Sequence, residues 1–446
     1  MLRQIFVLCI MIIGAYYSLQ GPFYALLFYL WNAYFRPEIW LWNDVLRGAD
    51  LSYIIGCYIL IVTFLSRPKF ILNNRTVLIL LFLVQTFISV LVSPYYEYIW
   101  PFWMEFLKIN IIGFLILILV DDFSKMRMVL LVIALSLGLE GAKQGWFYLL
   151  TSPGSPNTNP LPFLGDNNGV ALGMLMLVPI IGLLAQTASS KWARPAYSIL
   201  LIGVLYRGIS TYSRGGFLAC TALAVLYWLQ SRRKFRSLIA LLILMMIIVA
   251  TLPDVYWNRM NTIQTYEENE DESALSRFHF WQVALVMAQA HPFFGVGFNA
   301  YNKAYDAYDF LQGRYGHMRS VHSSPLGVTG ELGYLGLSLY VLLLLCAFRS
   351  CSRVSKLVTS YPDLLHLKST AMALRSGLSV FLIAGSFLPF QYNEMLWHYI
   401  FLSFTLDQVA HQAALEAIKG PPPPIINRPS SSLSPANMVF SGAKTT

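Results

Sequence analysis

The chain has 446 residues, of which 57% are hydrophobic and only 12% are charged. A soluble domain normally carries about 25% charged residues, so this composition excludes an ordinary soluble protein and indicates one that is embedded in lipid. The formal charge, 31 − 22 = +9, would suggest a nucleic-acid partner in a soluble chain. In a membrane protein the same excess is explained by Lys and Arg in cytoplasmic loops, so no nucleic acid is expected.

Apolar runs of roughly 20 residues recur along the chain, and each is long enough to cross about 30 Å of hydrocarbon as a helix. Residues 4–34 are interrupted by Gly21 and Pro22, so they form one kinked crossing or two short ones. The sequence therefore predicts an all-α polytopic membrane protein with about 12 transmembrane helices, or 13 if residues 4–34 cross twice. Arg3 favours twelve. Later crossings are expected at about 51–66, 76–92, 106–120, 128–150, 168–187, 195–210, 214–230, 237–252, 326–348, 374–390 and 394–412.

Basic residues fall on every second connection between these runs, which the positive-inside rule assigns to the cytoplasm. The remaining connections, among them 151–167, 211–214 and 253–325, then face outward. This divides the chain into a helical bundle (1–252), a large helical outer loop domain (253–325), C-terminal spans (326–414) and a tail (415–446). Pro421 to Pro424 and a Ser-rich run predict that the tail is disordered. The basic groups are Arg67/Lys69/Arg75, Lys125/Arg127, Lys191/Arg194, Arg232/Arg233/Lys234/Arg236 and Arg349/Arg353/Lys356/Lys368/Arg375.

The outer loop is too long for a simple connection, so it must carry its own structure. A helix is expected from about Ala274 to Ala290, capped by Ser273 or Asp271 and stopped at His291-Pro292. Contiguous carboxylates just before a helix are usually solvated and favoured by the helix N-terminus, so a metal site is not expected in the run Glu267, Glu268, Glu270, Asp271, Glu272. The five cysteines show no zinc-ligand or redox spacing.

Arg214 is the first candidate for function, in the outer turn Ser213-Arg214-Gly215-Gly216. An arginine at a membrane interface usually only reaches toward water. Here it stands on the side that the positive-inside rule does not populate, with Arg207 and Tyr212 nearby. A guanidinium beside free backbone N–H groups is suited to bind a diphosphate.

Arg277 is the second candidate. On a helix it shares a stripe with Trp281, Ala284 and Ala288, so it is either a structural arginine or a ligand contact. We favour the ligand contact because no acidic residue lies three or four positions away in register.

His322 is the third candidate, where the outer loop returns to the membrane in His322-Ser323-Ser324-Pro325. A lone histidine is more often structural than catalytic. Imidazole is nevertheless the side chain best suited to proton transfer near neutral pH, and cationic neighbours would keep it neutral, as a general base requires. These neighbours are Arg314, His317 and Arg319, and Glu331 follows nine residues after His322.

Taken together, these motifs resemble the O-antigen ligase/polymerase superfamily over roughly residues 165–345. The resemblance rests on Ser213-Arg214-Gly215-Gly216, on Arg277 four residues before Trp281, and on His322-Ser323-Ser324-Pro325. Asn32-Ala33-Tyr34-Phe35-Arg36-Pro37 is similar to the branch of exosortase-associated O-glycosylation ligases. Two further motifs are His291-Pro292-Phe293-Phe294-Gly295-Val296-Gly297 and Glu331-Leu332-Gly333-Tyr334-Leu335-Gly336.

The resemblance implies a GT-C-like glycosyltransferase of the bacterial inner membrane whose site faces the periplasm and uses no metal or other cofactor. Its donor would be a glycan on undecaprenyl diphosphate and its acceptor a sugar hydroxyl of lipid A-core. The family's essential residues map to Arg214, Arg277 and His322, and the expected substrate-binding residues are Arg207, Tyr212, Arg314, His317, Arg319 and Glu331. A polymerase, a protein O-oligosaccharyltransferase and, in a different class, a lipid-linked glycan transporter stay open. The oligomeric state is not predicted.

Overall fold

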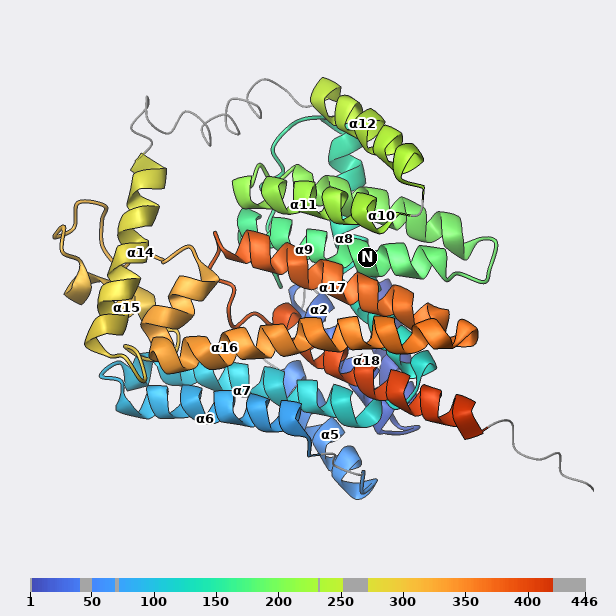
Figure 1. Ribbon diagram of the computed structural model, residues 1–446, viewed down its shortest axis with the longest axis horizontal. Coiled ribbons are helices and arrows are strands. Elements are labelled where there is room, and N and C mark those ends of the chain that lie inside the picture. Colours follow the sequence, from blue (N-terminus) through green and yellow to red (C-terminus); the bar gives the residue numbers. More distant parts are fainter. Residues whose placement is uncertain (1, 41–49, 69–71, 232, 252–271, 420–446) are drawn as a thin grey trace, which may run out of the picture.

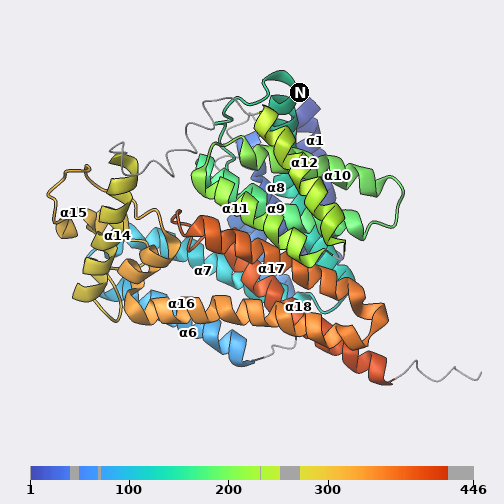
Figure 2. The same ribbon diagram turned by 45° about the horizontal axis from the view of Figure 1, so that its top comes forward.

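A computed structural model of the chain describes residues 2–40, 50–68, 72–231, 233–251 and 272–419. Within these ranges the chain is built from helices and contains no strand, apart from one isolated bridge between Leu161 and Gly165. The long helices pack side by side, and α14 and α15 project from one end of the bundle (Figures 1 and 2). The prediction of an all-α polytopic membrane protein is confirmed at this level.

Each of the eleven runs expected after residue 50 coincides with a helix. Five of the described helices are long and apolar enough to cross a membrane, namely α6, α7, α9, α16 and α17 with the short turns beside them. The bounds are α1 Leu2–Ser18, α2 Pro22–Phe35, α3 Pro37–Trp40, α5 Leu51–Leu65, α6 Asn74–Val92, α7 Tyr96–Leu119, α8 Phe123–Thr151, α9 Asn167–Gln186, α10 Ala193–Ile209, α11 Arg214–Gln230, α12 Lys234–Thr251, α14 Glu272–Ala290, α15 Tyr301–Tyr308, α16 Ser324–Leu357, α17 Leu365–Gly385 and α18 Glu394–Lys419.

Gly21 and Pro22 separate two antiparallel helices rather than bending one. A Cβ at Gly14 would lie 2.3 Å from the ring of Phe28, so α1 and α2 lie against each other along much of their length. Phe23, just after the turn, lies 5.6 Å from the Nζ of Lys125. The turn of this N-terminal hairpin is therefore at the end of the bundle that carries the basic connections.

Helix α9 forms the centre of the bundle, and every residue from Gly169 to Leu184 in it is buried. It packs between α10 and α17, and α10 in turn packs on α8. A Cβ at Gly145 would lie 1.9 Å from the carbonyl oxygen of Gly203, so only glycine permits this contact of α8 with α10. Close approach through small residues is typical of helices packed in a membrane.

Helix α16 is broken at Gly333, which has φ 69° and ψ −173°. The segment that follows α14 covers the break: the N–H of Val296 donates to the carbonyl of Gly330 at 3.0 Å, and the N–H of Tyr334 donates to the carbonyl of Pro292 at 2.8 Å. Gln85 on α6 donates to the carbonyl of Leu332 at 3.1 Å. Backbone groups freed by the break need such partners, because water does not reach them there.

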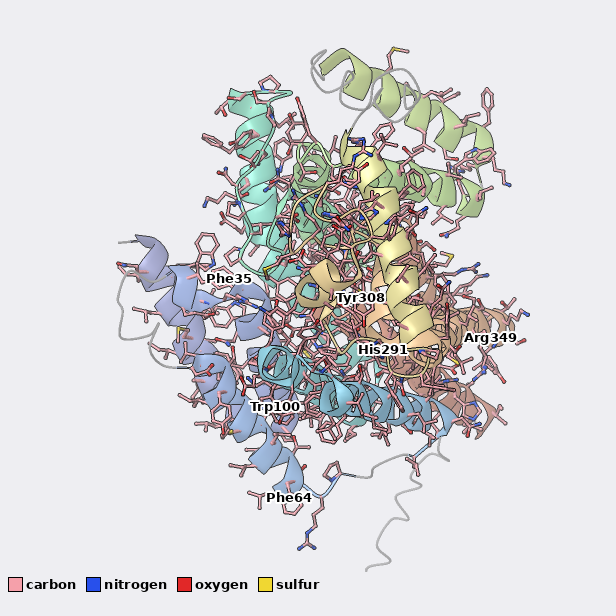
Figure 3. The ribbon with its side chains drawn as sticks, turned by 90° about the vertical axis from the view of Figure 1, so that its left-hand side faces the viewer. Phe35, Phe64, Trp100, His291, Tyr308 and Arg349 are labelled. Carbon is pink, nitrogen blue, oxygen red and sulfur yellow. The ribbon has the colours of Figure 1, made fainter. Side chains whose placement is uncertain are left out.

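The described part of the predicted loop, from Glu272 onward, therefore packs directly on the broken helix. The expected helix at 274–290 is observed as α14, whereas α15 was not predicted. His291 after α14 lies 2.7 Å from the hydroxyl of Tyr308 on α15, and the two residues are close together in Figure 3. Helix α18 continues to Lys419, into the predicted tail. The caps Asp271 and Ser273, most of the acidic run and residues 420–446 lie outside the described side chains.

Candidate active site at the end of the bundle

Helix α14 carries Arg277 and is fixed on α16 by an apolar face. Val283, Ala284, Met287 and Ala288 are fully buried. A Cβ at Gly330 would lie 3.3 Å from the carbonyl oxygen of Ala284, so the two helices approach closely. The predicted stripe of Ala284 and Ala288 is thus the packed face. Arg277 lies seven residues, about two turns, before Ala284 on the same helix.

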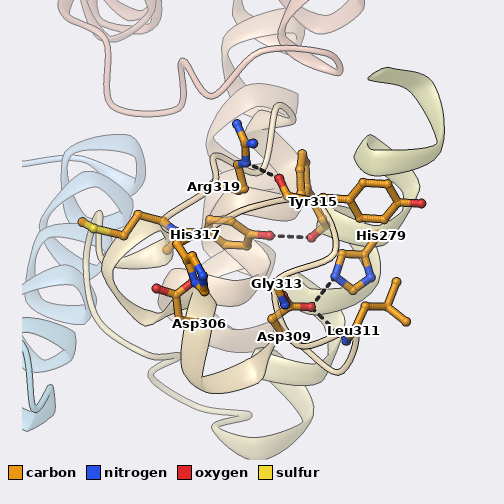
Figure 4. A network of polar contacts seen from close by, with 11 residues as sticks. His279, Asp306, Asp309, Leu311, Gly313, Tyr315, His317 and Arg319 are labelled. Atoms are coloured by element: carbon orange, nitrogen blue, oxygen red, sulfur yellow. Dashed lines mark hydrogen bonds and ion pairs between the residues drawn. The ribbon is translucent and has the colours of Figure 1, made fainter. Parts of the chain in front are cut away.

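His279 and Asp309 form a buried pair that shapes the loop after α15. Their Nε2 and Oδ1 atoms lie 2.7 Å apart, and each side chain is only 3% exposed. The carboxylate also accepts the N–H groups of Leu311 at 2.9 Å and Gly313 at 2.7 Å (Figure 4). Burial alone would raise the pKa of Asp309, but these donors and His279 outweigh it and lower the pKa. Neither residue was singled out from the sequence.

The same loop presents two arginines. Arg319 donates from Nε to the carbonyl of Tyr315, and Arg314 lies 5.5 Å from the centre of the Tyr315 ring (Figure 4 shows the Arg319 contact). Gly316 has φ 91°, and a Cβ there would lie 2.5 Å from Nη2 of Arg319. The positive φ favours glycine at this position, and a larger residue would also displace the guanidinium of Arg319.

His322 has a left-handed backbone conformation, with φ 49°. Non-glycine residues in this region are uncommon and cluster at functional sites, where the surrounding structure holds them. Here the next residues are clamped: the hydroxyl of Ser324 donates to the carbonyl of Leu388 at 2.6 Å and accepts the N–H of Phe390 at 2.9 Å. The imidazole itself is half-buried beside the ring of Phe280.

The electrostatic surroundings keep His322 neutral. Burial lowers its pKa from the ordinary value of 6.5, and the charges of Arg277 and Arg319 lower it further, while the carboxylate of Asp166 opposes them. Asp166 caps α9 by accepting the N–H of Gly169 at 2.8 Å. It was not predicted as a site residue, because in the sequence it is simply a helix cap.

Four of the residues predicted from the sequence, Arg277, Arg314, Arg319 and His322, line one cavity of about 520 Å³. We call it the Arg277–His322 cavity. Three guanidiniums around a neutral imidazole suit an anionic ligand beside a group that loses a proton. The complete lining is Ser276, Arg277, Phe280, Arg314, Tyr315, Gly316, Arg319 and His322.

Arg214 begins α11 and is not in the lining of this cavity. Ser213 caps the helix by accepting the N–H of Gly216 at 3.1 Å. A Cβ at Gly215 would lie 3.7 Å from that of Phe387, whose ring is 6.4 Å from the ring of Trp281. Because Trp281 is one turn after Arg277, the connection between α17 and α18 links the two arginine-bearing elements.

Arg207 and Tyr212, which were predicted to bind substrate, make hydrogen bonds to other parts of the chain and do not line the Arg277–His322 cavity. Arg207 is fully buried; its guanidinium donates to the side chain of Gln144 and to the carbonyls of Asn157 and Asn159. The buried Tyr212 donates its hydroxyl to the carbonyl of Gly154. Both residues anchor the segment 153–159 to the turn between α10 and α11.

Glu331 and His317 are also placed away from the cavity. Glu331 is 2% exposed; its carboxylate accepts the N–H of Tyr301 at 3.2 Å and the side-chain amide of Gln391 at 3.0 Å. It therefore joins α15, α16 and the α17–α18 connection. His317 is exposed and contacts Asp306 at 3.3 Å. Neither lines the Arg277–His322 cavity.

The comparison with known families agrees with the motifs. Residues 196–341 match the family model described as O-Antigen ligase, a segment that runs from α10 into α16 and contains Arg214, Arg277 and His322. No curated protein matches the sequence. The family match confirms the resemblance of this chain to the O-antigen ligase/polymerase superfamily.

Proposed function

We propose that the chain is an O-antigen ligase, a glycosyltransferase that moves a glycan from undecaprenyl diphosphate to a sugar hydroxyl of lipid A-core at the periplasmic face of the bacterial inner membrane. The observation that carries the proposal is the Arg277–His322 cavity, where three arginines and His322 share one lining inside the segment that matches the family. Guanidiniums are the side chains best suited to hold a diphosphate through paired hydrogen bonds.

In the proposed mechanism the acceptor hydroxyl oxygen attacks the anomeric carbon, and the bond from that carbon to the phosphate oxygen breaks. His322 takes the hydroxyl proton, which its lowered pKa permits at neutral pH. Arg277, helped by Arg214, stabilises the charge that develops on the leaving diphosphate. A single displacement of this kind inverts the anomeric configuration. Since a diphosphate is already a good leaving group, the mechanism uses no metal or other cofactor.

A GT-C-like arrangement, with the lipid tail between helices and the site at one end of the bundle, forms part of the proposal. The N-terminal hairpin supports 13 crossings rather than 12, because its turn lies beside Lys125 at the basic end. The start of α1, which includes the N-terminus of the chain, and the end of α2 would then both lie on the side of the Arg277–His322 cavity. Cytoplasmic placement of the basic end follows from the positive-inside rule.

Two alternatives share this chemistry. A polymerase would accept the glycan on another lipid-linked glycan, and a protein O-oligosaccharyltransferase would accept it on Ser or Thr. A transporter of lipid-linked glycans would instead move its substrate without forming a bond. Incubation of the purified chain with undecaprenyl diphosphate-linked glycan and each acceptor in turn separates all four.

The test uses two histidines of the same loop. His322→Ala should reduce transfer by about 10²–10⁴-fold, the usual contribution of a general base. His317→Ala is the matched control, because His317 is exposed and outside the cavity lining, and it should retain activity. Equal activity of the two variants, or lipid movement without a new glycosidic bond, would contradict the proposal.

A further inference from the structure

A second cavity, of about 740 Å³, lies between the start of α6, the second half of α16 and α18, and we call it the Arg349 cavity. From Ser324 to Arg349 the rise along α16 is roughly 38 Å, somewhat more than the hydrocarbon thickness of about 30 Å. Helix α6 runs the opposite way: it begins at this cavity, and beyond its far end Ser93 donates to the carbonyl of Val296 at 2.7 Å. The Arg349 cavity is therefore at the opposite face of the membrane from His322.

The Arg349 cavity has a surplus of positive charge. Asp407 is the acidic residue in its lining; Arg353 lies 2.9 Å from its carboxylate, and Arg75 pairs with the same oxygen. Arg349 is exposed and has no ion-pair partner among the described residues. Three guanidiniums thus face one carboxylate. The N-terminus of α6 is at the same cavity; Asn73 accepts the N–H groups of Arg75 and Thr76, and the helix dipole adds a partial positive charge.

Exposed apolar stripes lead from this cavity along the bundle. On α6 and α16 the exposed residues recur every three or four positions, so each series lies on one face of its helix. The α6 series begins at the cavity with Asn74, and the α16 series ends there with Arg349. The acyl chains of a lipid would pack against such apolar residues, whereas a soluble anion would not contact them. The apolar members are Val77, Leu81, Val84, Leu342 and Leu345, with exposures of 39%, 51%, 54%, 41% and 46%.

We propose that the Arg349 cavity binds the phosphate headgroup of an anionic phospholipid, with the acyl chains against α6 and α16. Basic pockets between membrane helices at the cytoplasmic leaflet bind lipids of this class. Arg349 would contact the phosphate, while the Asp407 pairs keep Arg75 and Arg353 in place. This site is independent of glycan transfer, and activity does not enter its test.

The test measures lipid retention by native mass spectrometry on the full chain in non-ionic detergent with equal amounts of phosphatidylglycerol and phosphatidylcholine. The wild-type chain should retain phosphatidylglycerol preferentially. Arg349→Gln leaves the Asp407 pairs intact and should weaken this retention about fivefold, the value of one basic residue at an anionic surface. Arg194→Gln, the same change at an exposed residue of α10, should have no effect. Arg349→Lys keeps the charge and should preserve the preference.

Three results would overturn the proposal. The first is equal retention of the two lipids by the wild-type chain. The second is an equal loss in Arg349→Gln and Arg194→Gln, which would mean that only overall charge matters. The third is binding of glycerol phosphate as tight as that of phosphatidylglycerol, which would make the Arg349 cavity a site for soluble phosphate compounds.

Discussion

Replacing Asp309 with asparagine tests whether one buried carboxylate organises the loop that carries Arg314 and Arg319. The carboxylate accepts hydrogen bonds from His279 and from the N–H groups of Leu311 and Gly313. Asparagine keeps the shape but offers one acceptor oxygen, and its amide nitrogen would face a donor. The variant therefore loses the charge and at least one of these bonds.

The magnitude follows from the strength of hydrogen bonds to charged groups, about 1.5–3 kcal/mol each. A local loss of about 2–3 kcal/mol, if it is felt fully in the alignment of the site, lowers the rate of transfer about 30- to 150-fold. If other contacts also hold the loop in place, the rate of glycan transfer in Asp309→Asn falls by less than this. The thermal midpoint should fall as well, since the side chains of Asp309 and His279 are both 3% exposed.

Asp306→Asn, three residues earlier at the end of α15, is the matched control. Its carboxylate is 43% exposed, contacts His317 at 3.3 Å in a surface pair worth about 0–1 kcal/mol, and accepts the N–H of Met318 at 3.1 Å, which the amide oxygen of asparagine can also accept. Initial rates of glycan transfer and thermal midpoints of both variants decide the matter. Indistinguishable variants would refute the role of Asp309. Because the folded-state pKa of Asp309 is lowered, its stabilisation is complete above about pH 4 and is lost only as the pH falls further. The difference should thus be constant from pH 5 to 8.

Three further predictions concern separate features. If His322 is the base, kcat/KM for the donor should be constant above neutrality and fall at a midpoint below pH 6.5, because the pKa of His322 is lowered in the free chain; a kcat/KM that does not fall as the pH is lowered, with chemistry limiting, would exclude that role. Gly333→Ala should cost about 1–3 kcal/mol in backbone strain, and more from contact with Pro292, whereas Gly56→Ala, within a regular helix, should be tolerated in thermal unfolding. Arg207→Gln should lower the thermal midpoint without raising KM for the donor, because its bonds are to protein carbonyls; a selective rise in KM would restore the original assignment.

The helices were predictable because lipid leaves the chain few choices: an apolar run of sufficient length must be helical. Two features were not accessible in the same way. Gly21-Pro22 is compatible with a kink and with a hairpin, and only the contact of Gly14 with Phe28 distinguishes them. The break at Gly333 depends on partners from α6 and from the segment after α14, both far away in the sequence.

The site shows a similar division. Arg277, Arg314, Arg319 and His322 were predicted from the loop itself, and they line one cavity. Arg207 was predicted from the same kind of signal, but the sequence does not show which carbonyls a guanidinium reaches, and this one reaches those of Asn157 and Asn159.

His279 and Asp309 were not predicted from the sequence, because neither carries a local signal of its own. They are 30 residues apart, and each is unremarkable until the fold pairs them.

The cations of the Arg277–His322 cavity serve two purposes that are coupled through charge. When the cavity holds no substrate, Arg277 and Arg319 lower the pKa of His322 and favour its unprotonated form. A bound diphosphate would bring negative charge to the same guanidiniums and offset their effect, so the pKa of His322 should rise toward or above its ordinary value. A stronger base would thus be created only when the donor is present. Since kcat/KM reports the free enzyme and kcat the complex, the acidic midpoint of kcat should lie at higher pH than that of kcat/KM. In Arg277→Gln the separation should shrink, and identical midpoints in the wild-type chain would show that the diphosphate is held elsewhere.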